Sequence, residues 1–316
     1  MKKLILISCL SLLSIFTFAQ QETQFTQFMY NKLMINPAYA GSSRTQSLSA
    51  LYRNQWIGLE GAPVAQVLSF DTPLMNNRVG LGGTLSRNTI GINERYTFDV
   101  AYAYRIPVGQ GYLGIGLQTS LRYFSNNYSD SRLVGTRPIS GDGAVPQGIQ
   151  TKFIPNFGAG VFYNAKQYYF GVSIPRIILN RVTFADVLST IGKEVPHVYF
   201  MGGGALDLGE NLQLHPQLLV KYVPNVPLDA DLNLNAVINS KFIAGLSYRL
   251  GGSSKSIGES IALIIGARLS DSIDFTASYD FTLSEIRDYS SGGLEVGLRF
   301  YLKKQEGDDV SNPRFF

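Results

Sequence analysis

The sequence is poor in the residues that most often carry chemistry. Its 316 residues include one cysteine, two histidines and one tryptophan, and only 16% of them are charged. So few cysteines and histidines argue against a disulfide framework and against a zinc site, and we expect no metal and no cofactor. The 27 basic and 23 acidic residues are evenly spread, so the charge balance gives no reason to expect a nucleic-acid partner.

Long apolar runs are also missing after the first twenty residues, which argues against a helical membrane protein. Within those twenty, two lysines are followed by an apolar stretch, Leu4–Phe18, and by the small residue Ala19. This order predicts a signal peptide over residues 1–19, rather than an uncleaved anchor helix, because the apolar stretch is short. Cleavage after Ala19 would remove Cys9 and leave a mature chain without cysteine.

The rest of the chain alternates between apolar and polar residues with a period of two. The stretch 95–106 shows this clearly, with one face formed by Tyr96, Phe98, Val100, Tyr102, Tyr104 and Ile106. Such alternation is typical of strands that have one apolar face. The segments run for about ten residues, which is the length of a tilted strand that crosses a bilayer.

Fourteen segments share this pattern. They cover residues 46–54, 64–71, 79–87, 94–106, 112–124, 152–164, 168–175, 196–206, 211–222, 228–238, 241–250, 260–270, 272–282 and 293–302. Connections after even-numbered segments are short and those after odd-numbered ones are longer, as in outer-membrane barrels whose termini are both periplasmic. We therefore predict an all-β fold, a transmembrane antiparallel β-barrel of about fourteen strands over residues 45–302, in the bacterial outer membrane. The alternative, a soluble β-sandwich, rarely needs so many strands.

The polar face of each strand is predicted to line the lumen, while the apolar face contacts the lipid of the outer membrane. The predicted lumen charges have both signs: Arg95, Arg105, Arg122, Lys221, Lys241, Arg249 and Arg299 against Asp99, Asp229, Asp231, Asp274, Asp280 and Glu295. This mixture suits internal salt bridges better than an ion-selective pore. Glycines recur on the same face, at positions 80, 82, 114, 116, 158 and 160. They indicate either barrel curvature or a bare wall that seats a plug.

Two segments lie outside the predicted wall. In residues 20–44, Phe25, Phe28, Met29 and Leu33 fall at helical spacing before Asn36-Pro37 ends the run. An apolar segment in the periplasm must be covered, most simply inside the barrel, so we expect it to occlude the lumen. Residues 303–316 follow the last strand and are expected to form a periplasmic tail.

Several short motifs in these segments resemble the PorP/SprF family of outer-membrane proteins of the type IX secretion system. They are Gln27-Phe28-Met29-Tyr30-Asn31, Asn36-Pro37-Ala38-Tyr39-Ala40-Gly41-Ser42, Tyr52-Arg53-Asn54-Gln55-Trp56 and Pro313-Arg314-Phe315. The resemblance implies a fourteen-stranded barrel in a Bacteroidetes-type envelope. It also implies export or surface anchoring of a large secreted protein, such as a gliding-motility adhesin. The implied partners are the C-terminal sorting domain of that secreted protein, periplasmic secretion components, or both.

The motif residues are the candidates for contact with a plug or a partner. They are Phe25, Phe28, Met29, Asn36, Pro37, Tyr39, Gly41, Arg53, Asn54, Gln55, Trp56, Pro313, Arg314 and Phe315. Pro37 fixes the turn that ends the N-terminal segment, and Gly41 permits a sharp backbone step before the first strand. The polar groups of residues 53–55 could bond a plug or a partner, and Trp56 is expected to anchor at the lipid headgroups.

Catalytic motifs are missing from the sequence. His197 and His215 fall on consecutive predicted strands and could face each other, but no acidic residue accompanies them at metal-ligand spacing. No phosphate-binding loop or nucleophile elbow is present, so we expect a protein that is not an enzyme. An alternative function is an outer-membrane channel for hydrophobic small molecules with an N-terminal hatch, because fold alone does not fix function.

Overall fold

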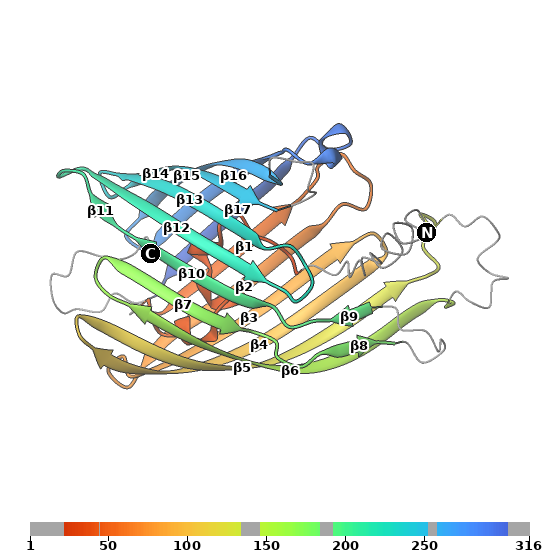
Figure 1. The fold of residues 1–316 in the computed structure, drawn as a ribbon, viewed down its shortest axis with the longest axis horizontal. Helices are drawn as coiled ribbons and strands as arrows, with labels where there is room; N and C mark the ends of the chain where they lie inside the picture. The colour runs from red at the N-terminus through yellow and green to blue at the C-terminus, as the bar shows by residue number, and fades with distance from the viewer. Residues whose placement is uncertain (1–21, 44, 134–145, 184–191, 252–257, 303–316) are drawn as a thin grey trace, which may run out of the picture.

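The computed structural model describes residues 22–43, 45–133, 146–183, 192–251 and 258–302. The predicted signal peptide, the C-terminal tail and the candidates Pro313, Arg314 and Phe315 lie outside the described residues. The described residues contain no helix with the length and apolarity of a membrane span. They form a single barrel of tilted strands with a short segment inside it (Figure 1).

Fifteen strands form one antiparallel sheet that closes on itself. The ring is complete because the first strand, β1, pairs with the last strand, β17, and because β10 pairs with β12. Fourteen of these strands have seven residues or more, and the two-residue strand β11 follows β10 along β12. The strands are β1 (Ser47–Asn54), β2 (Val64–Leu74), β3 (Val79–Ile90), β4 (Asn93–Val108), β5 (Gly111–Asn127), β6 (Ile149–Asn164), β7 (Tyr168–Ile174), β10 (Val198–Gly204), β11 (Leu206–Asp207), β12 (Leu212–Tyr222), β13 (Asp229–Ile238), β14 (Phe242–Leu250), β15 (Ser260–Ser270), β16 (Ile273–Thr282) and β17 (Gly293–Tyr301). The predicted barrel of fourteen strands is confirmed.

The two ends of the barrel differ in their connections. We call the end with residues 55–63, 128–148, 175–197, 251–259 and 283–292 the long-loop rim, and the opposite end the short-turn rim. One connection departs from the predicted parity, because β3 and β4 are joined at the long-loop rim by only Gly91 and Ile92. Gly91 has a positive φ of 56°, which a tight turn readily uses. Within residues 175–197, β8 (Asn180–Val182) and β9 (Gly192–Glu194) form a separate two-stranded sheet.

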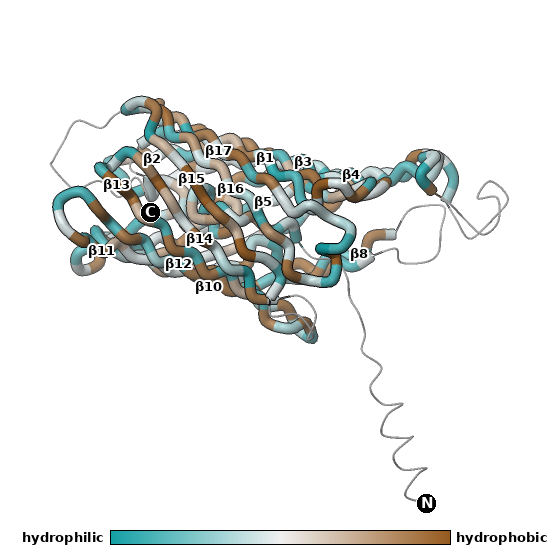
Figure 2. Tube along the Cα trace, turned by 90° about the horizontal axis from the view of Figure 1, so that it is seen from above, coloured by the Kyte–Doolittle hydropathy of each residue, from teal (hydrophilic) through white to brown (hydrophobic). Residues whose placement is uncertain are grey.

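The alternation of the sequence becomes an outer and an inner face. Along β4, Phe98 is 52% exposed on the outside, whereas Asp99 is buried on the inside. Apolar and polar residues accordingly alternate along the strands (Figure 2). All the predicted lumen charges are buried or half-buried except Lys241, which is exposed in the turn between β13 and β14. The prediction was wrong for Lys241 because this residue lies in a turn, where side chains do not alternate between the two faces as they do along a strand.

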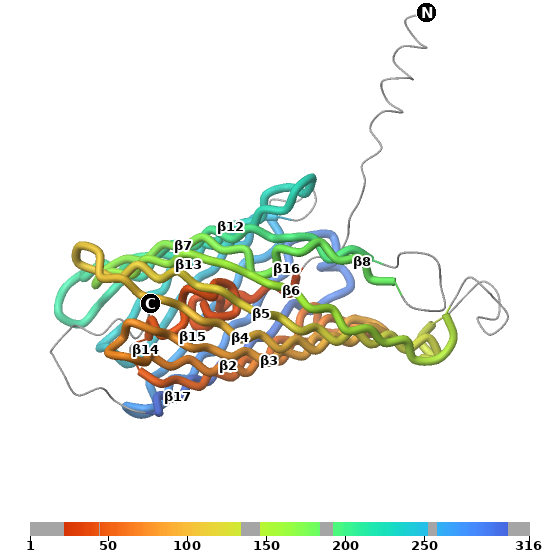
Figure 3. Tube along the Cα trace, turned by 90° about the horizontal axis from the view of Figure 1, so that it is seen from below, coloured from red at the N-terminus to blue at the C-terminus, as the bar shows by residue number. Residues whose placement is uncertain are grey.

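The N-terminal segment, residues 22–43, lies inside the barrel, and we call it the plug (Figure 3). It contains three short 3₁₀ helices, η1 (Phe28–Tyr30), η2 (Lys32–Met34) and η3 (Pro37–Tyr39), in place of one longer helix. Another 3₁₀ helix, η5 (Glu285–Asp288), lies in the loop before β17. The main apolar cluster of the protein joins plug residues such as Phe28 and Met29 to wall residues such as Phe162. The predicted occlusion of the lumen by this segment is therefore confirmed.

Candidate functional site: the plug, its seat and the vestibule

Glycines on the inner face of β5 leave room for the backbone of η3. A Cβ atom on Gly114 would lie 2.6 Å from the carbonyl oxygen of Ala38. On Gly116 it would lie 2.5 Å from the carbonyl carbon of Pro37. Real Cβ atoms do not approach backbone atoms so closely, so only glycine fits at these positions. Of the two explanations for the lumen glycines, the seat for a plug applies here.

Asn36 is held by a second glycine seat, on β6 and β7. Its side chain would collide with a Cβ atom on Gly160, and its Nδ2 atom would lie 2.7 Å from one on Gly171. The same Nδ2 donates a hydrogen bond to the backbone oxygen of Val161 at 3.0 Å. Its Oδ1 accepts one from the backbone N–H of Ala38 at 2.9 Å, which caps η3. Asn36 is fully buried, so this amide both starts a turn and attaches the plug to the wall.

The plug ends at the short-turn rim between an arginine and an aspartate. The backbone N–H of Gly41 donates to Asp71 at 2.6 Å, and Arg105 donates to the carbonyl oxygen of Gly41 at 2.6 Å. Gly41 has a φ of 71°, and a Cβ atom there would lie 2.6 Å from the Cα atom of Gly80. The predicted sharp step at Gly41 is thus present, and it is fixed on both sides by charged groups.

Arg53 of β1 connects the plug to the wall nearer the long-loop rim. It donates hydrogen bonds to Asp280 at 2.5 Å and to Glu295 at 2.7 Å, and it is 1% exposed. The same carboxylates accept from the plug: Glu295 from the backbone N–H of Thr26 and Gln27, and Asp280 from the hydroxyl of Thr26. The charge of a buried arginine must be paired, and here the paired carboxylates also hold the plug. Arg53 itself donates a hydrogen bond to the hydroxyl of Thr26 at 3.1 Å. The predicted bonding of Arg53 to a plug is therefore present.

The remaining candidates from the sequence lie on or near the same path. Phe25, Phe28, Met29 and Tyr39 are buried in the apolar clusters between plug and wall. Pro37 is the first residue of η3, as expected for a residue that fixes a turn. Asn54 ends β1, and Gln55 donates its backbone N–H to Pro63. Trp56 is half-buried with a φ of 57°, and it lines a cavity at the long-loop rim; its contact with headgroups stays a prediction.

That cavity, which we call the vestibule, has a volume of about 760 Å³. Its floor is the first part of the plug, residues 22–24, and its sides include Trp56, Phe124, Val195 and Pro227. A smaller cavity of about 90 Å³ lies deeper against the plug. Several residues line both cavities, and the ionisable ones among them are Glu22, Arg95, Arg122 and His197. The vestibule therefore has a charged floor and a side wall in which apolar residues lie beside charged ones such as Glu94 and Glu259.

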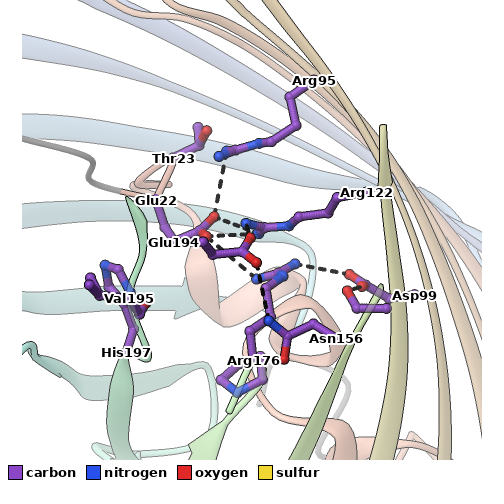
Figure 4. A network of polar contacts seen from close by, with 12 residues as sticks. Glu22, Thr23, Arg95, Asp99, Arg122, Asn156, Arg176, Glu194, Val195 and His197 are labelled. Carbon is purple, nitrogen blue, oxygen red and sulfur yellow. Dashed lines mark hydrogen bonds and ion pairs between the residues drawn. The ribbon is translucent and has the colours of Figure 1, made fainter. Parts of the chain in front are cut away.

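A polar network forms that floor (Figure 4). Glu22 pairs with Arg122 at 2.7 Å, with Arg95 at 3.5 Å and with Arg176 at 3.8 Å. Arg122 also pairs with Glu194 of β9, which accepts a further hydrogen bond from Asn156 at 3.1 Å. Burial disfavours the Glu22 carboxylate, but the three arginines outweigh this and hold its pKa well below the usual range. One arginine thus connects the plug with the loop that carries β9.

Comparison with known proteins adds the family. The family model for the type IX secretion system membrane protein PorP/SprF matches residues 17–300. The chain belongs to the PorP/SprF family. The resemblance seen in the motifs thus extends over nearly the whole chain, and this PorP/SprF protein is an outer-membrane β-barrel. A search of curated protein sequences finds no match.

Solved structures similar to this PorP/SprF barrel include an outer membrane protein, a channel and a porin. The outer membrane protein Omp33 of Acinetobacter baumannii has 7% identity and a TM-score of 0.48, over 82% of this chain and 100% of that one. The CymD monoaromatic hydrocarbon channel has 12% identity and a TM-score of 0.48, over 89% and 94%. The KdgM porin has 9% identity and a TM-score of 0.37, over 81% and 99%. The fold assignment rests on the strand pairing described above.

The PorP/SprF barrel does not bring the two histidines together. Val198 pairs with Tyr222 and Gly203 with Gln217, so His197 and His215 lie at opposite ends of the β10–β12 pair. The prediction that they could face each other was wrong, because β10 begins after His197 and the register moves His215 to the other rim. Sequence reasoning also missed Glu22, Arg176 and Glu194, which lie outside the alternating segments and carry no periodic signal.

Proposed function

We propose that this barrel is a non-enzymatic component of type IX secretion that binds a large secreted protein, periplasmic secretion components, or both. The observation that carries the proposal is the closed lumen, in which the plug is fixed at the short-turn rim, at its middle and nearer the long-loop rim. A barrel closed in this way acts through its surfaces rather than as a conduit. Binding would support export or surface anchoring of the secreted protein, for which a gliding-type adhesin with a C-terminal sorting domain is the proposed client.

The orientation is part of the same proposal. The long-loop rim would face the outside of the cell, where longer loops are usual, and the short-turn rim would face the periplasm. β1 begins and β17 ends at the short-turn rim, because Ser47 pairs with Tyr301. A tail after residue 302 would therefore start in the periplasm, within reach of periplasmic components. The vestibule would then open toward the cell surface.

Gene deletion tests this function. We expect the deletion strain to lose one or more surface proteins while the permeability of the envelope to small hydrophilic dyes stays unchanged. Expression of the wild-type chain should restore them, and the client should co-purify with the barrel from detergent. A deletion strain with a normal set of surface proteins would contradict the proposal.

The alternative, a channel for hydrophobic small molecules, makes a different prediction. It requires an apolar path, whereas the floor of the vestibule is formed by the arginines and carboxylates around Glu22. This arrangement favours the secretion role. Uptake of a labelled hydrophobic compound by reconstituted vesicles, above the level of protein-free vesicles, would favour the channel instead.

A further inference from the structure

Three arginines from different parts of the wall converge on one carboxylate of the plug. Arg95 is on β4, Arg122 is on β5 and Arg176 follows β7. Their guanidinium groups lie 3.5, 2.7 and 3.8 Å from the Glu22 carboxylate. Only the contact with Arg122 has the length of a strong ion pair. Arg95 reaches Glu22 at a longer distance, and Arg176 lies closer to Asp99, at 3.3 Å, than to Glu22.

Each of the three arginines has one buried N–H donor without a hydrogen-bond partner in the described part of the chain. Arg122 is 1% exposed, yet its Nε atom has no hydrogen-bond partner among the described residues, and the same holds for the Nε atoms of Arg95 and Arg176. A buried donor without a partner is costly. The Nε atom of Arg53 lacks a described partner as well, so this cluster is distinguished by having three such guanidiniums around one carboxylate of the plug. An additional or differently placed acceptor in this cluster would satisfy them.

Glu22 differs from the other carboxylates that pair with buried arginines. Asp280 and Glu295, which hold Arg53, belong to wall strands and cannot leave without breaking the barrel. Glu22 belongs to the plug, its side chain is 18% exposed, and it lines the vestibule. The neighbouring residues Thr23 and Gln24 are attached separately, to Asn88 and Asp229. The Glu22 side chain can therefore turn into the vestibule while the plug stays in place.

We propose that Arg95, Arg122 and Arg176 form a carboxylate-binding site which Glu22 occupies in the closed protein, and that a carboxylate of a partner polypeptide replaces it. The forked guanidinium groups match a carboxylate, and the vestibule has room for several residues around it. The apolar residues of its side wall, among them Trp56 and Phe124, suit the side chains of a polypeptide better than a free small anion. The carboxylate comes from an acidic side chain or from a C-terminus.

Replacement of Glu22 by a partner carboxylate would also affect the loop that carries β9, because Arg122 contacts both. Arg122 holds Glu194 of β9 with its other guanidinium nitrogen, and Glu194 is held in turn by Asn156 and by Asn180 at 3.2 Å. A partner carboxylate bound to Arg122 would therefore lie beside Glu194, in the connection between β7 and β10. The inference rests on the proposed function only for the source of the carboxylate, which is a secreted or periplasmic polypeptide.

Peptide binding to the full-length protein in detergent tests the site. The probe is a fluorescent, N-acetylated tetraglutamate amide, followed by fluorescence anisotropy. We expect Glu22→Gln to bind it about tenfold more tightly than the wild type, because the internal competitor is removed. Adding Arg122→Gln, or the less buried Arg95→Gln, should abolish that gain. The matched control is Glu60→Gln, which removes an exposed carboxylate that lies at the same rim and lines neither cavity, and should leave the affinity unchanged.

Further peptides separate the two sources of the carboxylate. Tetraglutamine with a free C-terminus reports on a terminal carboxylate, and tetraglutamine amide is the uncharged control. Equal affinity of Glu22→Gln and the wild type for both charged peptides would overturn the proposal. Competition by inorganic phosphate as strong as that by the peptides would also overturn it, as it would reveal a general anion site. Heat-dependent migration in gels confirms that each variant is a folded barrel.

The outcome is separable from that of the proposed function. If the deletion strain loses surface proteins but no peptide distinguishes Glu22→Gln from the wild type, the secretion role stands and the carboxylate site fails. If the peptides bind as expected but the surface proteins are normal, the site stands and the secretion role fails.

Discussion

A Cβ atom on Gly116 would lie 2.5 Å from the carbonyl carbon of Pro37, so the barrel wall and the plug touch backbone to backbone at this point. We expect Gly116→Val to destabilise the folded barrel by about 1–3 kcal/mol, because neither backbone can move aside in a packed interior. Unfolding in guanidinium, followed by tryptophan fluorescence, measures this change. Gly83→Val is the matched control, because a Cβ atom on Gly83 would meet its nearest atom at an ordinary 3.9 Å. Equal stability of the two variants would show that the plug is not seated against β5.

Removing the plug should open the lumen. In planar lipid bilayers, we expect a chain that lacks residues 22–41 to conduct ions and the intact chain to remain closed, because the plug contributes much of the apolar cluster inside the barrel. Asn36→Ala provides a second variant that keeps the segment but removes its hydrogen bonds to Val161 and Ala38. It should show brief openings. Steady, equal conductance by the intact and truncated chains would mean that the plug does not close the barrel.

Arg53 should be essential for stability because two buried carboxylates depend on it. We expect Arg53→Met to lower the free energy of unfolding by about 3–5 kcal/mol, since Asp280 and Glu295 would lose their cation. The triple variant that also carries Asp280→Asn and Glu295→Gln should recover most of this loss. Arg132→Met is the control, as it breaks a solvent-exposed pair with Asp130 and should leave the free energy of unfolding nearly unchanged, because water screens the pair. A similar loss for both arginines would contradict the assigned role.

The orientation of the barrel can be tested by cysteine labelling. Glu60 and Asp271 are both exposed acidic residues, the first at the long-loop rim and the second in the turn between β15 and β16. We expect a membrane-impermeant maleimide to label Glu60→Cys on intact cells and to label Asp271→Cys only after permeabilisation. A predicted mature chain without cysteine keeps the background low. The reverse pattern of labelling would invert the proposed orientation.

Much of the wall was predictable because a strand in a bilayer obeys a single local rule. Each residue of β4 faces either lipid or lumen, so its polarity reveals its direction, as Phe98 and Asp99 show. The seat of Asn36 was predictable only in part. The glycines indicated a close approach, but the choice of β6 and β7 depends on contacts between residues more than a hundred positions apart.

The charged floor of the vestibule was beyond prediction for a related reason. Glu22 lies 100 residues from Arg122, and Glu194 lies in a loop without alternation, so no local pattern connects them. The two-residue turn between β3 and β4 was missed because these strands continue past the predicted ends. In each case the deciding interaction is set by how distant segments pack together.

The pairing of β1 with β17 has a consequence for how the molecule is made. The first and last strands of the wall meet only when the whole sheet has formed, and the plug immediately precedes the first of them. Wall glycines and buried arginines enclose the plug at several heights, so threading it into a finished cylinder would require breaking those contacts again. In the simplest order of assembly, the strands pack around the N-terminal segment first, and the pairing of β1 with β17 forms last. The plug would then act as an internal template that sets the register of the wall before the barrel closes.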